Sequence, residues 1–462
     1  MTRPSRAPTK PNGTVRRWHI PPPLLHGPEP LEGGVVLAEV PGPVGLLLWQ
    51  ALRDVLLWVE APPGLRAELF DPEAAEARRR AIAEAEPDRA LAAPLSTLTA
   101  LLDAPEHADG AAVARACEEI AAWAEGRGAP RAALAFLQDA ALAEPADPAP
   151  ALAAARIAAR LGDHARAEVW YRRAIGIARR ARAWRPYARA FSGLGTLYQS
   201  RGNLPGAQRF HVRALRGARR GGLRLERAVA LHDLFGLAVE AGRARDAERL
   251  AREAFAAYPA RSPRRAVLAH DVAYFWMEQG HYDRALRVFR SVAPLIERPT
   301  ERLWVDADLM RAAAGAGDRD LARRTAADVG ERSRQPGMVA AAARAQLEVA
   351  RGELLLGDVD AAAVAAAAAL RLASSRRDGR TIVMAESLLD AIRQRRATGV
   401  APEPPTGQQR PAAGDPADSL AEEMIRALGE LSPSDVSPRE EHASGLPESN
   451  VSTMKPLEAW TP

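Results

Sequence analysis

The chain has 462 residues, a hydrophobic content of 47% and a formal net charge of +5. This length and composition are enough for a large core, in several domains or in one repeat array. A single cysteine, Cys117, excludes an intramolecular disulfide framework and a cysteine-based metal cluster, and the basic start "MTRPSRAPTKPNGTVRRWH" lacks the apolar stretch of a secretory signal. We therefore expect a cytoplasmic protein.

Proline-rich segments mark the beginning of the chain. Residues 1–43 contain "IPPPLL", "GPEP" and "PGP", which predict an extended or disordered arm with at most a short strand at "GGVVLAEV". The segment from Val44 to Val59 is too short and too charged to cross a bilayer, so we interpret it as a buried or amphipathic helix. With the helix predicted after Asp71 and Pro72, residues 44–116 form a helical cap or degenerate repeats.

A repeat follows. The segment "GNLPGAQRFHVRA" has six relatives in the chain, and each copy begins with a glycine: Gly128, Gly162, Gly202, Gly242, Gly280, Gly317 and Gly357. The fifth residue after the glycine is always alanine: Ala133, Ala167, Ala207, Ala247, Ala285, Ala322 and Ala362. The residue eight positions before the glycine is always apolar, and the residue twelve positions after it is always alanine or valine.

This pattern predicts a helix hairpin. Glycine at a helix C-terminus adopts the left-handed conformation that ends the first helix, and a short turn follows. Alanine then lies where the second helix crosses the first, because a larger side chain would hold the two backbones apart. Each hairpin leaves an apolar face that only its neighbours cover, so the hairpins stack.

The third copy, "FSGLGTLYQSRGNLPGAQRFHVRA", resembles the tetratricopeptide repeat (TPR) family. Matching positions are Phe191, Leu194, Gly195, Tyr198, Ala207 and Ala214, whereas His211 replaces the usual aromatic residue. The resemblance covers Glu118 to Leu372. It implies an all-α, right-handed α-solenoid of about seven helix-turn-helix repeats over residues 117–397, with disordered arms at both ends. It also implies a protein-binding scaffold rather than an enzyme, with no cofactor.

Charge is distributed unevenly along the chain. Residues 151–227 contain 18 basic and 3 acidic residues, whereas the tail from residue 401 contains 4 basic and 11 acidic residues. The arginines form solvated helix faces, or they bind an acidic partner or the chain's own tail. Nucleic acid is a third possible partner, but residues 151–227 contain no recognised nucleic-acid module. A protein or peptide is therefore the expected partner.

Residues 398–462 are predicted to be a disordered, acidic tail rich in proline and serine, with one short helix near "DSLAEEMIRALGEL". We expect this tail to occupy the groove of the array when no partner is bound. A regulatory or sensor protein that controls a nucleic-acid-associated process is the alternative function.

In TPR arrays the first helices line the concave groove, so their polar residues are the expected contacts with a partner. The predicted contact residues are Arg156, Arg160, Arg189, Gln199, His232, His270, Tyr274 and Glu278. Some members of the family bind a C-terminal carboxylate through Asn and Lys, but this array has no Lys and only Asn203, so that clamp is not expected.

Two His-Asp pairs leave a different possibility open. His232 with Asp233 and His270 with Asp271 occupy the same position in adjacent copies, and residues of these types bind metal ions or act as acid and base. The next copy retains only Asp308, so we favour a polar lining over a metal site. The sequence contains no established catalytic motif, and we expect no catalytic residue and no metal.

Overall fold

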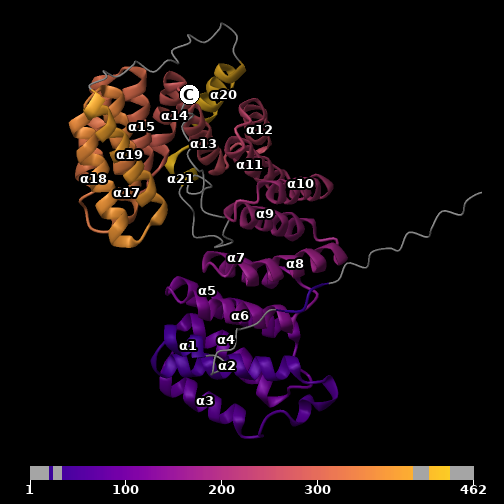
Figure 1. The fold of residues 1–462 in the computed structure, drawn as a ribbon. Coiled ribbons are helices and arrows are strands. Elements are labelled where there is room, and N and C mark those ends of the chain that lie inside the picture. The colour runs from indigo at the N-terminus through magenta and orange to yellow at the C-terminus, as the bar shows by residue number, and fades with distance from the viewer. Residues whose placement is uncertain (1–19, 24–33, 399–415, 437–462) are drawn as a thin grey trace, which may run out of the picture. The chain divides into compact units, whose positions relative to one another are not determined.

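The computed structural model describes residues 20–23, 34–398 and 416–436, and every regular element in these ranges is a helix (Figure 1). The chain divides into two compact units, residues 1–197 and 198–462. Within each unit, most helix contacts join helices that are consecutive in the sequence. The predicted all-α helical-repeat fold is therefore confirmed.

The seven copies correspond to seven successive helix pairs. The first helices are α5 (Gly110–Gly126), α7 (Pro148–Arg160), α9 (Trp184–Ser200), α11 (Arg224–Glu240), α13 (Arg264–Glu278), α15 (Pro299–Ala316) and α17 (Val339–Leu356). The second helices are α6 (Pro130–Ala143), α8 (His164–Arg180), α10 (Leu204–Arg220), α12 (Ala244–Ala257), α14 (Tyr282–Val292), α16 (Arg319–Arg332) and α18 (Val359–Arg376). The single-turn helix η2 (Ala293–Leu295) extends α14, and α19 (Gly379–Thr398) packs on α17 and α18.

The seven repeat glycines all lie in the turns and all adopt the left-handed conformation, with φ between +68° and +85°. At Gly242 a Cβ atom would contact nothing within 4 Å. Glycine is required there by the backbone conformation and not by crowding. The prediction that these residues end the first helices is confirmed.

Polar caps fix the start of the second helices. In four of the seven turns, the residue after the glycine is Asp163, Asn203, Asp318 or Asp358, and its side chain accepts a hydrogen bond from the backbone N–H three residues later. This bond satisfies an amide that has no partner inside the helix. In these four turns, glycine and cap together locate the hairpin turn.

The seven repeat alanines are all completely buried, with an exposed fraction of 0%. The residues twelve positions after the glycines are also 0% exposed: Ala140, Ala174, Ala214, Ala254, Val292, Val329 and Ala369. Small side chains therefore lie at the closest contacts of the array, as the sequence predicts. The positions that recur in the sequence are therefore also the positions that are buried in each hairpin.

Helices precede the array within the first unit: α1 (Gly34–Glu39), α2 (Gly42–Glu60), α3 (Ala74–Ala85) and α4 (Arg89–Asp103), with the 3₁₀ helix η1 (Pro63–Glu68). The short strand predicted at 33–40 is wrong, because this segment forms α1 over Gly34–Glu39. The Glu39 carboxylate accepts hydrogen bonds from the backbone N–H groups of Arg131 and Ala132 at the start of α6. This long-range contact outweighs the local strand preference of the valines.

The segment from Val44 to Val59 lies inside α2, and its apolar side buries Leu48, Leu52, Val55 and Trp58. None of the helices in the described ranges is long and apolar enough to cross a membrane.

Residues 20–23 lie against α8, where Arg173 donates to the Pro21 carbonyl oxygen at 2.6 Å. The disorder predicted for 1–19, 24–33, 399–415 and 437–462 concerns residues outside the described ranges.

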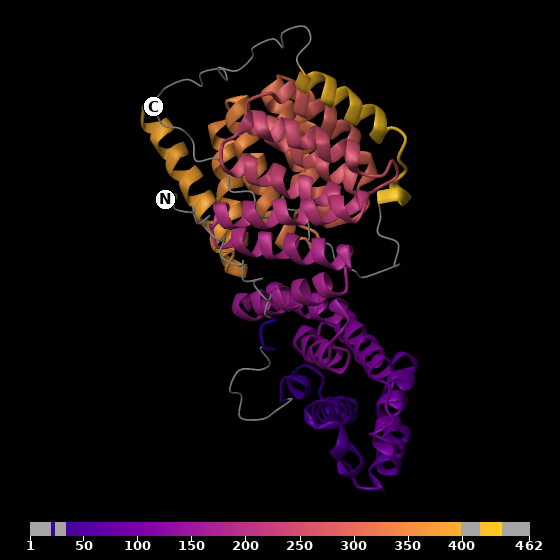
Figure 2. The same cartoon turned by 90° about the vertical axis from the view of Figure 1, so that its right-hand side faces the viewer.

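The tail contributes two helices to the second unit, α20 (Pro416–Leu428) and α21 (Pro433–Val436). The first of these is the predicted short helix. It packs mainly on α14 and also contacts α12 and α13 (Figures 1 and 2). The expectation that the tail occupies the first-helix groove is thus wrong for α20, which lies chiefly on second helices because its acidic N-terminal turn meets arginines there.

The crossing alanines give a direct test of the packing. We expect Ala247→Leu in α12 to lower the free energy of unfolding by about 1–3 kcal/mol, because the added carbons force the paired helices apart. Ala256→Leu, at an exposed position of the same helix, should change it by less than ~0.5 kcal/mol. Urea unfolding followed by circular dichroism measures both, and equal effects would contradict the packing rule.

Candidate binding surface

A column of buried carboxylates runs through the first helices of the second unit. Each lies nine residues before the turn glycine of its copy: Asp233, Asp271, Asp308 and Glu348. Their exposed fractions are 4%, 0%, 0% and 2%. A buried carboxylate is costly unless it is paired and hydrogen-bonded, so each of these groups needs a basic partner.

The histidines of the preceding copies supply two of these partners. His232 Nε2 lies 2.9 Å from Asp271 Oδ2, and His270 Nε2 lies 3.0 Å from Asp308 Oδ2. The other ring nitrogen of His232 lies 3.2 Å from the Tyr258 hydroxyl. One helix earlier in the chain, His211 Nδ1 in α10 lies 3.1 Å from Asp233 Oδ2. We call these alternating groups the His-Asp ladder: His211, Asp233, His232, Asp271, His270 and Asp308.

The ladder shifts the pKa values of His270 and Asp271. Burial by itself lowers the pKa of His270, but hydrogen bonds to Asp271 and Asp308 outweigh burial and raise that pKa to about 9. Burial likewise raises the pKa of Asp271, while His232 and His270 lower it further than burial raises it, so the net shift is downward. Hydrogen bonds between His232 and Asp271 and between His270 and Asp308 therefore join adjacent repeats, and a charged bond such as that of His270 is stronger than a neutral one.

The geometry bears on the metal hypothesis. The Nε2 atoms of His232 and His270 each point at the carboxylate of the next copy, and Nδ1 of His270 lies 3.5 Å from Asp271 Oδ1. In the described part of the chain, no group of three or more His, Cys, Asp or Glu side chains could hold a metal ion. The predicted residues His232 and His270 are only 6% and 7% exposed, so they lie in the interior between repeats.

The fourth carboxylate of the column, Glu348 in α17, has arginine partners instead. Arg311 Nη1 lies 2.9 Å from Glu348 Oε2, and Arg351 Nη1 lies 2.7 Å from Oε1. The Tyr274 hydroxyl donates to the same carboxylate at 3.4 Å, and Arg311 also pairs with Glu278. We call these five residues the Arg-Glu network.

The predicted residues Tyr274 and Glu278 thus belong to one network that links α13, α15 and α17. Burial raises the pKa of Glu348, but the charges of Arg351, Arg311 and Arg344 lower it more. The predicted contact residues did not include Arg311, Glu348 or Arg351, because the prediction covered only the second to fifth copies. The carboxylate that recurs nine residues before the glycine is the signal that would have identified Glu348.

The predicted arginines of the first unit form a third group. Arg156 and Arg160 lie on α7 and Arg189 lies on α9, and Arg160 forms an ion pair with Glu125 of α5. Burial lowers the pKa of Arg156, and repulsion by Arg160 and Arg189 acts in the same direction. Tyr171 of α8 lies close enough to Arg156 to interact with it electrostatically, and burial raises the pKa of Tyr171 to about 12. We call Arg156, Arg160 and Arg189 the arginine cluster.

The remaining predicted residue, Gln199, lies in the second unit and donates to Glu240 Oε2 at 2.8 Å. The eight predicted residues therefore do not form one site. Three lie in the arginine cluster, two in the His-Asp ladder, two in the Arg-Glu network, and Gln199 bonds to α11.

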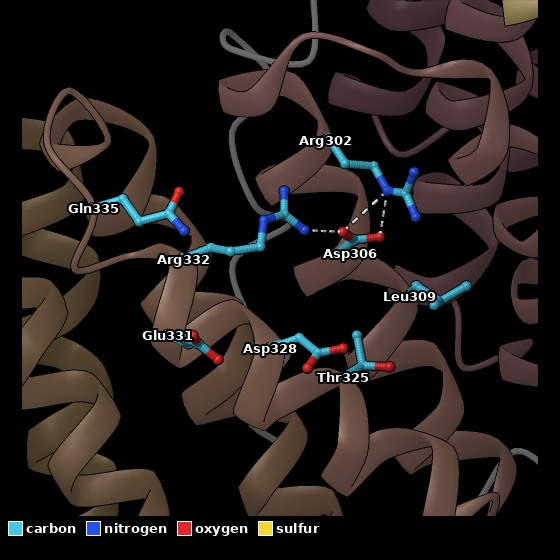
Figure 3. A pocket seen from close by; sticks show the side chains of 8 residues that line it. All are labelled: Arg302, Asp306, Leu309, Thr325, Asp328, Glu331, Arg332 and Gln335. Atoms are coloured by element: carbon cyan, nitrogen blue, oxygen red, sulfur yellow. Dashed lines mark hydrogen bonds and ion pairs between the residues drawn. The ribbon is translucent and has the colours of Figure 1, made fainter.

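A hollow of ≈ 380 Å³ opens between α15 and α16 (Figure 3). It is lined by Arg302, Asp306, Leu309, Thr325, Asp328, Glu331, Arg332 and Gln335. Asp306 accepts hydrogen bonds from Arg302 at 2.8 and 3.0 Å and from Arg332, so both guanidinium groups already have a carboxylate partner. Asp328 and Glu331 add further negative charge, so the hollow offers no excess of positive charge to an anionic ligand.

Comparisons with known proteins do not assign the chain to a family. No family model and no curated protein matches the chain. It is similar to a solved Rap protein complexed with Competence and Sporulation Factor, at a TM-score of 0.38 and 10% identity over 77% of this chain and 99% of that one. It is also similar to a circular tandem repeat protein with a novel repeat topology, at a TM-score of 0.17 and 17% identity over 77% and 97%. The helical-repeat fold rests on the hairpins themselves.

The His-Asp ladder should make stability depend on pH. Because the pKa of His270 is raised above its ordinary value of 6.5 to about 9 in the folded chain, its contribution is complete below pH ~6.5 and is lost as the pH rises through ~9. Between pH 6.5 and 9.5, we expect the free energy of unfolding to fall by about 1–3 kcal/mol more in the wild type than in His270→Gln. Urea unfolding at both pH values measures this difference, and exposed His107→Gln should retain the wild-type slope.

Removing Arg311 from the Arg-Glu network should leave the buried Glu348 carboxylate with fewer basic partners. We expect Arg311→Met to lower the free energy of unfolding by ~2 kcal/mol, below the usual loss for a broken buried pair because Arg351 still contacts Glu348. Adding Glu348→Gln should recover part of that loss, since the stranded charge is removed. Exposed Arg319→Met is the control, and a double variant as unstable as Arg311→Met alone would contradict this account.

Proposed function

We propose that the protein is a helical-repeat scaffold that binds a segment of a protein partner on its first helices, with a preference for acidic segments. The arginine cluster carries this proposal. Arg160 and Arg189, from two successive first helices, both act on the partly buried Arg156 and lower its pKa, while Glu125 acts in the opposite direction. An acidic segment would add a favourable charge beside Arg156.

The physical basis is the environment of Arg156. A partly buried guanidinium beside two others loses hydration and is repelled by its neighbours, so it gains more from an added carboxylate than an exposed arginine does. Guanidinium groups bind carboxylates through two parallel hydrogen bonds, which fix orientation as well as charge. A partner with spaced acidic residues fits this arrangement.

We further propose that the protein acts in the cytoplasm by binding and not by catalysis. The His-Asp pairs, which would be the natural acid and base, already bond to one another across the repeats. Burial raises the pKa of the Cys117 thiol well above its usual range, so it is a poor nucleophile. These side chains stabilise the repeats instead of serving a reaction.

A charge-reversal experiment tests the proposed surface. We expect the wild type to bind a fluorescein-labelled ten-residue oligoglutamate peptide in low salt. Arg156→Glu with Arg189→Glu should weaken binding by about tenfold, because two favourable charge contacts become repulsive. Arg179→Glu with Arg180→Glu, which makes the same charge change at exposed positions of α8, should weaken it by less than about threefold, as distant exposed charges are screened.

Fluorescence anisotropy measures each affinity, and circular dichroism confirms that the variants fold. Equal losses in both double variants would show that only net charge matters and would reject the cluster. Tighter binding of a labelled ten-nucleotide single-stranded DNA than of the peptide would favour the nucleic-acid alternative.

A further inference from the structure

The tail helix α20 occupies a defined seat on the second unit. It lies against α14 and contacts α12 and α13 (Figures 1 and 2). Its buried residues, Ala417, Leu420, Ala421, Met424 and Leu428, are 2% exposed or less. They recur at intervals of three or four residues, so α20 is amphipathic and buries one continuous stripe.

Charge fixes the orientation of α20 in its seat. Asp418, in the first turn of the helix, lies 2.9 Å from Arg284 Nε and 3.0 Å from Arg287, both on α14. Arg284 is 5% exposed, and its guanidinium lies 5.2 Å from the centre of the Trp276 ring. Asp418 therefore pairs with the buried guanidinium group of Arg284.

A second arginine extends the contact along the helix. Arg252 of α12 donates to the Pro416 carbonyl oxygen and lies 3.9 Å from Glu423. The seat thus contacts three features of α20: an acidic residue in its first turn, an acidic residue near its middle, and its apolar stripe. Helix-in-groove recognition of partner proteins uses this combination of features.

We propose that this seat, formed by α12, α13 and α14, is a binding site for acidic amphipathic helices of partner proteins, and that α20 is a tethered occupant which such a helix displaces. The site is distinct from the arginine cluster: it lies in the other unit and chiefly on second helices. The expected ligand has an aspartate in its first turn and apolar residues two, three, six and ten positions later, as Asp418, Leu420, Ala421, Met424 and Leu428 have.

Three observations support exchange. The hairpins beneath α20 carry the full repeat pattern, and their residues Ala247, Ala254, Ala285 and Val292 are 0% exposed. α20 belongs to the same chain as its seat, which gives it an effective concentration that a free helix lacks. A helix of 13 residues is also marginal on its own, so α20 depends on its seat more than the seat depends on α20.

The experiment uses the full chain and a fluorescein-labelled peptide of residues 416–431. In the wild type the tethered α20 competes with the peptide. We expect a full chain with Asp418→Arg and Met424→Asp, which loosen α20, to bind the peptide at least about tenfold more tightly than the wild type does, because the competing tether is removed.

A matched pair of variants tests the seat itself in the loosened chain. Arg287→Glu should weaken peptide binding at least fivefold, and a peptide carrying Asp418→Arg should bind this variant better than the native peptide does. Arg290→Glu lies on the same helix but pairs with Asp318, so it should change binding less than twofold.

A second arm leaves α20 unaltered, in case the loosened chain does not fold. A site-specific protease sequence inserted between residues 399 and 415 of the full chain allows α20 to be cut free, after which the array should keep its helical circular dichroism and bind the labelled peptide. Unfolding on cleavage, or a folded array that binds no peptide, would overturn the proposal. Sedimentation of the wild type as a dimer that Asp418→Arg with Met424→Asp converts to a monomer would assign the seat to α20 of a second copy and would also overturn it.

Discussion

Close approach of paired helices is the constraint on which the structure depends. Two backbones cross only where the side chain between them is small, and the alanine five residues after each turn glycine is 0% exposed in all seven copies. The glycine makes that approach possible, because its left-handed backbone lets the chain reverse within a few residues. The turn glycine and the crossing alanine recur together in every copy, so each hairpin presents the same faces to its neighbours and the hairpins stack.

Stacking then decides where polar groups can be buried. In the last four copies one position of the first helix faces the preceding repeat, and a carboxylate occupies it each time, as Asp233, Asp271, Asp308 or Glu348. Each lies beside a basic group from the preceding copy or helix. Such pairs add specificity to the order of stacking, since a shifted register would leave a buried charge unpaired. The histidines that suggested acid-base chemistry serve this purpose.

Arginine has two different roles in the molecule. In the Arg-Glu network and in the seat of α20, guanidinium groups pair with carboxylates and so link one helix to another. In the arginine cluster of the first unit, Arg160 and Arg189 repel the partly buried Arg156. This repulsion is the basis of the acidic partner proposed above, whereas the paired arginines hold helices together.

The sequence by itself determined the helical hairpins, their turns and their crossing points, because glycine conformation, capping and side-chain size act within a few residues. It also identified Tyr274, Glu278 and the histidines as polar residues of first helices. Only the tertiary structure decided which groups pair, since His270 meets Asp308 and Glu348 meets Arg311 across 38 and 37 residues. The same is true of α1, which contacts between distant residues turn into a helix, and of α20, whose place on α14 is set by the buried Arg284. Local rules specify elements, whereas burial of charge is decided by neighbours that are distant in the chain.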